Sequence, residues 1–574
     1  MNNNLRPMLW ALFFATVAML WFKWDAANTA ATQMTTQTTA SSVTKTQSVV
    51  ENQLSADLPA PTPEQGGGSA AAVPSVMAVP GSTPKMLNSG KLIHVKTDTL
   101  DIAIDTVGGT IVESKLLKYP VSVTDNTPIK LFTSTQGKLF HLQSGVNSNR
   151  ATNATHQAAF SAPQSNYEIT GDSISVPLTW SQDGVTVTKT FTFHQGRYDF
   201  EIKQTVNNQS SQPWHGYAYQ QLKRAELVIE RGLGSFNTFA GAAYSTPEKK
   251  YNKVGFEELG TSPINVKAVT GGWEAMIEHY FMGALIPVQN SKNTFYSNKN
   301  NDGNYVIGMY GDTTSVQPGS QVTFKMTGFV GPKVKDDLAR IAPNLDKATD
   351  YGWLFFISEF LFNVLNWVHS VVKNWGWSIV IVTLVIKTIL FPLAAKSFKS
   401  MAKMRKFQPE MERLRENYAE DRQLLGKKMM ELYKKEGINP ASGCLPILVQ
   451  IPIFLAFYYM LMESVELRQA PWIFWIKDLS LRDPMYILPV INMALMFVQQ
   501  RLNPPPSDPI QRRVMMFLPL VFGFLFLVFP SGLVLYWAVS NLFSIIQQYV
   551  ITKRYGGLAH PLSHAEDKHY HPKK

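Results

Sequence analysis

The pattern of hydrophobic and polar positions divides the chain into four stretches. Residues 8–22 form a continuous apolar run, whereas residues 26–90 contain few large apolar side chains. From residue 91 to residue 340, apolar and polar side chains alternate with period two, which is typical of half-buried β-strands. Beyond residue 350, long apolar runs are separated by short charged segments. The sequence therefore predicts a multi-domain membrane protein with an all-β domain and an α-helical membrane core.

The alternating stretch is predicted to be one large β-sandwich. The runs ISVPLTW and VTVTKTFTF flank Asp183-Gly184, a dipeptide typical of a two-residue hairpin turn. The positions of the second run that share one face are Val185, Val187, Phe191 and Phe193. The stretch contains no HExxH, GxSxG or phosphate-loop motif. Its scattered Asp, Glu and His residues are interpreted as solvated surface.

The N-terminal apolar run could be a cleaved signal peptide or an uncleaved anchor. Bulky residues Trp21, Phe22 and Trp24 stand where a small-residue cleavage site would begin, which favours the anchor. The Thr-, Ser-, Gln-, Ala- and Pro-rich stretch that follows cannot bury enough apolar surface to offset its ordering entropy. It is predicted to be a flexible periplasmic linker and an inert spacer.

The first apolar segment after the β-domain, residues 351–374, carries polar side chains every three or four residues. Such a stripe is typical of an amphipathic helix that lies in the membrane interface. The genuine spans are expected in the apolar runs that follow. Three basic segments follow residue 395, and the positive-inside rule places all of them on the cytoplasmic side of the membrane. This is possible only if the chain turns at Pro530-Ser531-Gly532 and so divides the last apolar stretch into two helices. The sequence therefore predicts six transmembrane helices.

This arrangement places both termini in the cytoplasm and the β-domain on the opposite side of the membrane. A single helix over residues 514–549 would be about 54 Å long, against a hydrocarbon core of about 30 Å. The last two spans, at about 16 residues each, would favour a locally thinned bilayer. The predicted segments are an anchor (1–25), a linker (26–90), the β-domain (91–340), an interfacial helix (351–374), a second span (375–395), a cytoplasmic helical hairpin (396–437), a third span (441–466), a periplasmic loop (467–484), a fourth span (485–500), a cytoplasmic loop (501–513), a fifth span (514–529), a sixth span (533–550) and a basic tail (551–574).

The second span contains Lys387 in its interior. An ammonium group at the bilayer centre costs about 2.5–3.5 kcal/mol on insertion scales. The side chain could snorkel toward the cytoplasmic interface, or it could face a hydrated cleft that attracts anionic groups. Polar residues in three spans favour the cleft, although each alone could form an interhelical hydrogen bond. They are Thr383, Gln450, Ser540, Asn541, Ser544 and Gln547.

The charged segment 396–437 carries apolar residues with coiled-coil-like spacing, which predicts two antiparallel helices joined near residues 417–421. This hairpin could be a solvated charged element or a docking arm in the cytoplasm. The net charge of +11 is concentrated in such short segments, which indicates membrane orientation rather than sequence-specific binding of nucleic acid. The candidate docking residues are Lys403, Arg405, Lys406, Arg413 and Arg415.

Several stretches together resemble the YidC/Oxa/Alb family of membrane protein insertases in its Gram-negative form. In the membrane region these are QPEMERLRE, CLPILVQIPIF, DPMYILP and FPSGLVLYW, and in the β-domain GGWEAMIEHYF. The resemblance implies a bacterial inner-membrane protein with a periplasmic supersandwich similar to sugar-mutarotase folds. It also implies a five-helix core around a groove open to cytoplasm and lipid. It implies a positive groove charge at Lys387, where arginine is usual, and client contacts at Thr383, Tyr536 and Trp537. Tyrosine is commoner at the last position.

The resemblance also implies partners: nascent membrane proteins, the ribosome, the Sec translocon with its accessory subunits, and the lipid bilayer. The predicted function is therefore that of an insertase and chaperone for membrane proteins, without a chemical active site, cofactor or metal. Two other classes stay open. A secondary transporter or channel for a small anion would use Lys387 as its binding site, but no inverted repeat is visible. A membrane-anchored carbohydrate-active enzyme would need an acid–base pair that the β-domain sequence does not reveal.

Overall fold

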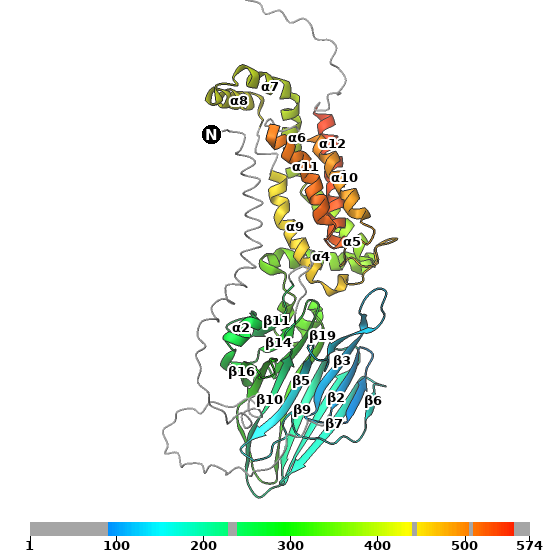
Figure 1. The fold of residues 1–574 in the computed structure, drawn as a ribbon, viewed down its shortest axis with the longest axis vertical. Helices are drawn as coiled ribbons and strands as arrows, with labels where there is room; N and C mark the ends of the chain where they lie inside the picture. Colours follow the sequence, from blue (N-terminus) through cyan, green and yellow to red (C-terminus); the bar gives the residue numbers. More distant parts are fainter. Residues whose placement is uncertain (1–89, 228–237, 439–444, 504–508, 556–574) are drawn as a thin grey trace, which may run out of the picture. The chain divides into compact units, whose positions relative to one another are not determined.

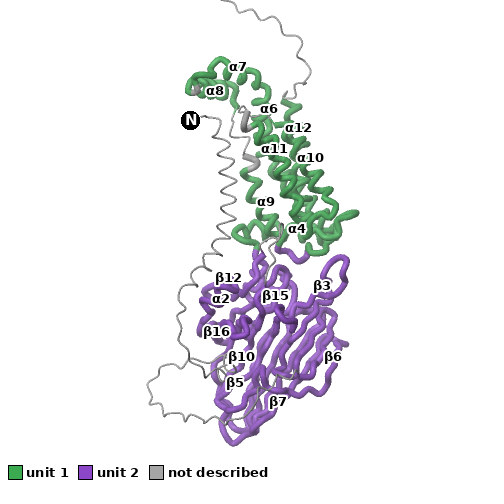
Figure 2. The backbone as a smooth tube through the Cα atoms, viewed as in Figure 1, with its two compact units in different colours: residues 1–47, 351–462, 467–574 green, residues 48–350, 463–466 purple. Residues whose placement is uncertain are grey.

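The computed structural model describes residues 90–227, 238–438, 445–503 and 509–555 (Figure 1). The predicted anchor, almost all of the predicted linker and most of the basic tail lie outside the described residues. The chain divides into two compact units, which are described separately (Figure 2). One unit contains Ser48–Asp350 and Glu463–Glu466 and holds the β-domain. The other contains Met1–Gln47, Tyr351–Met462 and Leu467–Lys574 and holds the helices from α4 onward.

The β-domain is a sandwich of two mainly antiparallel sheets, as the alternating pattern predicts. Along its hydrogen-bonded path the larger sheet contains β13 (Asn265–Thr270), β16 (Lys292–Lys299), β17 (Tyr305–Gly311), β10 (Trp214–Arg224), β5 (Phe140–Ser148), β3 (Thr110–Pro120), β2 (Leu100–Asp105), β1 (Leu92–Lys96) and β6 (Asn166–Glu168), with β18 (Thr314–Val316) beside β10 and β4 (Pro128–Phe132) beside β3. The smaller sheet contains β12 (Asn252–Gly255), β11 (Gly241–Ser245), β14 (Trp273–Ile277), β15 (Phe281–Pro287), β19 (Ser320–Pro332), β9 (Asp199–Asn208), β8 (Val185–His194) and β7 (Ser173–Gln182). Two short helices, α2 (Phe256–Thr261) and α3 (Lys335–Ile341), complete the domain.

The predicted hairpin is confirmed. Strands β7 and β8 pair in antiparallel register from Gln182 and Val185 outward. The two turn residues, Asp183 and Gly184, both have positive φ, at 52° and 74°. This is the backbone of a type I′ turn, whose twist matches that of the flanking strands. The four residues predicted to share one face of β8 are buried in the core.

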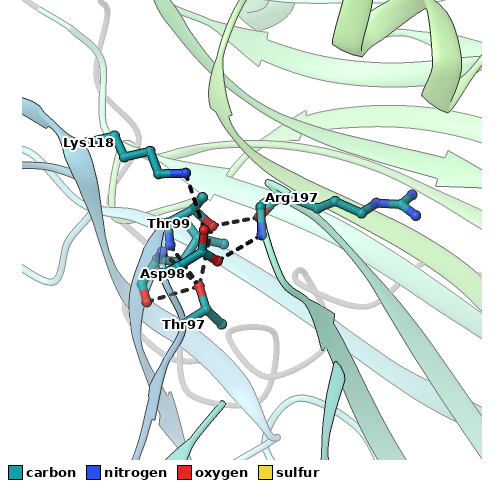
Figure 3. A network of polar contacts seen from close by, with 7 residues as sticks. Thr97, Asp98, Thr99, Lys118 and Arg197 are labelled. Atoms are coloured by element: carbon teal, nitrogen blue, oxygen red, sulfur yellow. Dashed lines mark hydrogen bonds and ion pairs between the residues drawn. The ribbon is translucent and has the colours of Figure 1, made fainter. Parts of the chain in front are cut away.

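The core lies between the two sheets and is built from their inward-facing side chains. Phe191, Phe200 and Phe329 come from the smaller sheet, and Phe140 and Phe295 come from the larger one; all are buried. The turns at one end are tied together by polar contacts (Figure 3). The Thr99 hydroxyl between β1 and β2 donates to the carbonyl of Arg197 before β9, at 2.8 Å.

The interpretation of the Asp, Glu and His residues of this domain as solvated surface is wrong for Asp199, Glu274 and His156, which are buried. The basic residue Lys189 is buried as well. Lys189 and Glu274 are completely buried, and His156 is 5% exposed. Each belongs to a strand or loop that packs toward the inside, so local alternation rather than residue type decides its position. The Lys189 Nζ donates to the carbonyl oxygens of Gly108 and Ser144, both at 2.6 Å.

Burial shifts the pKa values of Lys189, His156 and Glu274 in the direction that favours the neutral form of each side chain. It lowers the pKa of Lys189 to about 7. Burial, together with the charges of Lys189 and Lys223, lowers the pKa of His156 to about 3. Burial also raises the pKa of Glu274 well above its ordinary range, and neither carboxyl oxygen of Glu274 has a hydrogen-bond partner among the described residues.

The second unit is helical. Its helices are α4 (Phe355–Val372), α5 (Trp375–Ile389), α6 (Phe391–Lys406), α7 (Gln408–Asn417), α8 (Arg422–Glu436), α9 (Leu445–Glu463), α10 (Ile487–Leu502), α11 (Pro509–Phe526) and α12 (Ser531–Arg554). Within the described residues, two helical segments are long and apolar enough to cross a membrane, Gly352–Val372 and Ser531–Arg554, and the bent pair α5–α6 would make a third. Six spans, the cytoplasmic hairpin and the interfacial position of α4 stay predictions.

Two predicted boundaries differ from the structure. The sequence predicts a second span over residues 375–395, whereas α5 ends at Ile389 and α6 starts after a bend of 65°. Pro392 stands in the first turn of α6, where it cannot donate a backbone hydrogen bond to the preceding turn. In addition, α12 has 24 residues rather than about 16. At about 36 Å it is long enough to span an ordinary bilayer, so it does not support local thinning.

The predicted break between the last two apolar helices is confirmed. Helix α11 ends at Phe526 and α12 begins at Ser531, immediately after Pro530. The backbone N–H of Ser531 donates to the carbonyl of Leu481 at 2.7 Å, and the N–H of Gly532 donates to Leu479 at 2.9 Å. These bonds satisfy two donors at the start of α12 that have no partner within the helix.

Candidate functional site

Three helices meet around Lys387, which lies in the last turn of α5. A cavity of about 120 Å³ lies beside it. Polar side chains from α5, α9, α12 and the C-terminal end of α10 line the cavity together with apolar side chains, most of them from α6. The polar lining residues are Lys387, Gln450, Gln499, Asn503, Ser544 and Gln547. The cavity is large enough for several water molecules and offers them hydrogen-bond partners on more than one side.

The ammonium group of Lys387 is held by neutral partners. Its Nζ donates to Gln450 Oε1 on α9 at 2.8 Å and to Ser544 Oγ on α12 at 2.9 Å. The Gln450 Nε2 in turn donates to Ser540 Oγ at 2.7 Å. Among the described residues, no carboxylate forms an ion pair with Lys387. The two hydrogen bonds therefore satisfy two of the three N–H donors of the ammonium group, and its charge has no counter-ion among these residues.

Local sequence explains how α5 and α12 approach each other here. The Asn374 side chain accepts a hydrogen bond from the N–H of Trp377 at 3.0 Å and so fixes the start of α5. Small side chains on α12, such as Ser540 and Ser544, are buried and allow close packing. The polar stripe of α12 thus faces other helices, as its spacing along the helix allows.

Two pairs of amide side chains also join α12 to α10 and to the residue that follows it. The Asn541 Nδ2 on α12 donates to Asn492 Oδ1 on α10 at 2.8 Å, and Gln548 Nε2 donates to Asn503 Oδ1 at 2.9 Å. Asn492 and Gln548 are not among the residues that the sequence pattern predicts for the site. A lone amide in the apolar segment of α10 was the available signal for Asn492, because such a group needs a partner within a membrane.

The three positions identified through the family resemblance do not line the cavity. Thr383 is 1% exposed, and its hydroxyl donates to the carbonyl of Ile379 one turn earlier, at 2.6 Å. Tyr536 is 2% exposed and stacks on Phe457, with ring centroids 4.5 Å apart. Trp537 meets Phe454 edge-on, with ring centroids 4.4 Å apart. Thr383 and Tyr536 are thus packed inside the helical unit.

The candidate docking residues are not equivalent. Lys406 on α6 and Arg413 on α7 are exposed, whereas Lys403, Arg405 and Arg415 are half-buried. The Nζ of Lys403 donates to the backbone carbonyl of Glu436 at 3.0 Å and ties α6 to the end of α8. A structural role therefore competes with docking at Lys403.

The structure offers no metal site in its described segments, since no group of three or more His, Cys, Asp or Glu side chains could hold an ion there.

Comparison with solved structures finds a crystal structure of an active YidC insertase, 18% identical with a TM-score of 0.37, covering 81% of this chain and 95% of that one. A galactose mutarotase-like protein from Lactobacillus casei is 12% identical with a TM-score of 0.29, covering 42% of this chain and 99% of that one.

Comparisons of sequence are decisive. The family model of the YidC periplasmic domain matches residues 92–364, and the 60Kd inner membrane protein model matches residues 367–557. The membrane protein insertase YidC of Pseudomonas syringae pv. tomato is 44% identical over 89% of this chain and 93% of its own. That of Nitrosococcus oceani is 42% identical over 95% of this chain and 98% of its own. The chain therefore belongs to the YidC family of membrane protein insertases, which is not a family of enzymes.

Proposed function

We propose that this protein inserts membrane proteins and assists their folding by receiving polar segments of the client in the space around Lys387. The observation that carries the proposal is the hydrogen-bonding of Lys387 to Gln450 and Ser544, beside a cavity with polar and apolar walls. A cation that is solvated by neutral dipoles keeps its attraction for an anion. An acidic segment of a client can therefore exchange with the protein's own hydrogen bonds.

The physical gain lies in the desolvation path. A polar client segment that crosses an intact bilayer loses all its hydrogen bonds to water, at a cost of several kcal/mol per unsatisfied group. A cavity part of the way across offers donors and acceptors and shortens the apolar distance that remains. The apolar segment of the client then moves into lipid, and burial of about 20 apolar residues supplies the driving force.

Client contact at Thr383 and Tyr536 requires the helices to separate, because both side chains are buried. We infer that α5 and α12 part around the network of Lys387, Gln450 and Ser540 when a client enters. The three hydrogen bonds of this network join α5, α9 and α12, so exchanging them for bonds to a client would release these helices from one another.

The remaining elements have roles in topology and docking. We infer six spans with both termini in the cytoplasm and the β-domain in the periplasm. The exposed basic residues Lys406 and Arg413 then meet a ribosome or an emerging chain, and further contacts join the protein to the Sec translocon and its accessory subunits. This part of the proposal rests on the charge pattern and the family membership.

Site-specific crosslinking tests the proposal. A photoreactive side chain replaces Thr383, Tyr536 or, as the control, the exposed Leu525 of α11, and each variant meets a ribosome-stalled membrane-protein chain. Crosslinks are expected at the first two positions and not at Leu525. In parallel, Lys387→Arg should retain insertion and Lys387→Met should lose it. Crosslinks at Leu525 alone, or full insertion by the methionine variant, would refute the role of this site.

A further inference from the structure

The smaller sheet of the β-domain contains a notch where one strand stops before its neighbour. Strand β15 ends at Pro287, which pairs with Met326 of β19. On its other side, β19 stays paired with β9 as far as Ser320. Within the segments that the structure describes, residues 320–325 of β19 therefore pair with a strand on one side only. We call this segment the β19 notch.

The backbone of the notch is oriented to accept another strand. The N–H of Val330 in β19 donates to the carbonyl of Tyr198, on the side of β9. In an antiparallel ladder, successive residues direct their N–H and C=O groups to opposite sides. The even-numbered residues from Val322 to Val330 thus bond toward β9, and Thr323 and Lys325 direct their backbone groups into the notch. An open edge of this kind is a template for strand addition.

A cavity of about 440 Å³ opens at the notch. Its walls include Phe324 and Met326 from the inner face of β19 and Met309 from the inner face of β17. The pocket thus reaches between the two sheets and offers apolar walls to a side chain that points inward from an added strand. Its size falls in the range of ligand-binding pockets, which is about 300–1,000 Å³.

One of the residues that line this cavity, Gln220, carries a buried polar atom without a partner among the described residues. Gln220 is completely buried, and its Nε2 donates to Met309 Sδ at 3.3 Å. Its Oε1 accepts no hydrogen bond from any described residue. A buried acceptor without a donor is unfavourable, so an occupant that supplies a donor is favoured there.

The rim of the cavity is cationic. Lys292 and Lys325 are both exposed, and no ion pair joins either of them to a described residue. Asp312 also lies on the rim, which leaves a net positive charge. The preferred occupant is therefore an extended peptide with apolar side chains on one face, an amide donor among them, and acidic side chains on the other face.

We propose that residues 49–58 of this same chain, VVENQLSADL, bind in the β19 notch as an added strand. In an extended strand, Leu54, Ala56 and Leu58 share one face, and Glu51 and Asp57 share the other. The first face matches the apolar cavity and the second matches the lysine rim. Asn52, on the apolar face, carries an amide N–H group that can donate a hydrogen bond to Oε1 of Gln220.

No other part of the stretch 26–89 combines these features. Its remaining acidic residue, Glu64, is followed by a glycine-rich run, and residues 65–89 contain no acidic side chain. The reach is sufficient, because the thirty or so residues between Leu58 and Gly90 span roughly 100 Å when extended. Binding would anchor the segment on the β-domain, so that only the residues before it would act as a tether.

The test uses the full chain in detergent with residues 47–60 deleted and a fluorescent synthetic peptide of those residues. Saturable binding by fluorescence anisotropy is expected. The double variant Lys292→Glu/Lys325→Glu should weaken binding by about tenfold or more, since it replaces attraction by repulsion. A peptide with Leu54→Asp should bind far more weakly, and the control variant Lys138→Glu, on an exposed loop, should leave binding unchanged.

The undeleted chain supplies the second readout. Its own segment has an effective concentration of about millimolar order, so it should exclude the added peptide. Equal binding to the deleted and undeleted chains, equal binding of a scrambled peptide, or insensitivity to the lysine reversals would overturn the proposal. A photoreactive group at Val288 of the undeleted chain should crosslink within residues 49–58. A crosslink to a client chain instead would show that another occupant fills the notch.

Discussion

Replacing Lys189 with methionine removes one of the donors that join the two sheets of the β-domain. The Lys189 side chain on β8 reaches Ser144 on β5 of the opposite sheet and Gly108 in the turn between β2 and β3. Methionine fills most of the same volume but donates no hydrogen bond. Two buried carbonyl groups lose their donor at about 1–3 kcal/mol each. Because methionine avoids the cost of burying an amine, we expect a net loss of about 2–3 kcal/mol in the free energy of unfolding.

The same side chain makes stability depend on pH in a defined direction. Burial lowers the pKa of folded Lys189 to about 7, whereas an unfolded lysine has a pKa of about 10.4. Between these values the unfolded chain binds more protons, so stability rises with pH, by at most about 1.4 kcal/mol per pH unit. Below pH 7 both states are protonated and this contribution is constant. The neutral amine has two N–H donors, which match the two carbonyl acceptors.

The assay is guanidinium unfolding of residues 90–350, followed by tryptophan fluorescence at pH 6, 8 and 9.5. We expect the difference in unfolding free energy between the native sequence and Lys189→Met to grow by about 2–4 kcal/mol from pH 6 to pH 9.5. Taking the difference cancels the titration of other groups. The exposed Lys138→Met serves as the control and should track the native sequence. Parallel pH profiles for native protein and Lys189→Met would refute the reasoning.

Three further predictions concern other buried or constrained positions. Burial raises the pKa of Glu274, so the native protein loses stability as the pH rises. Glu274→Gln should therefore raise the free energy of unfolding by about 1–3 kcal/mol at pH 8 and by little at pH 4, as measured by guanidinium unfolding. Gly272→Ala should destabilise by more than about 2 kcal/mol in the same assay, since φ is +77° and the added Cβ would lie 2.1 Å from the carbonyl oxygen of Ser245. Asn374→Ala removes the cap that accepts from Trp377 and should cost about 1 kcal/mol, seen as a lower melting temperature of the full chain in detergent.

The sequence predicted the β-sandwich well because alternation and turn chemistry are local. Asp183-Gly184 marked the hairpin, and the inward face of β8 followed from period two. That same alternation places Lys189 between Val187 and Phe191 on the inward face. The signal for a buried lysine was therefore present. The acceptors could not be predicted, because Gly108 and Ser144 come from distant segments whose pairing is a property of the whole sheet.

In the helical site, too, the sequence predicts the polar residues but not the contacts between distant helices. The intramembrane lysine and the polar residues Gln450 and Ser540 stood out in apolar runs, and the structure joins them in one network. The burial of Tyr536 could not be foreseen, since helical periodicity says which residues share a face but not which helix that face meets. The bend after Ile389 had a signal in Pro392, although hydropathy continued smoothly through it.

Strand order in the smaller sheet sets a constraint on how the β-domain forms. β19 is the last strand of the domain in the chain, yet it lies between β15 and β9 in the sheet. Its register joins Phe329 to Asp199 and Ser320 to Asn208, partners that are far apart in sequence. Until β19 is available, β9 and β15 have no common neighbour, and the two halves of the sheet stay separate. The sandwich can therefore complete its folding only after the whole domain has been synthesised. Its folding rate must be low compared with that of a domain built from local contacts.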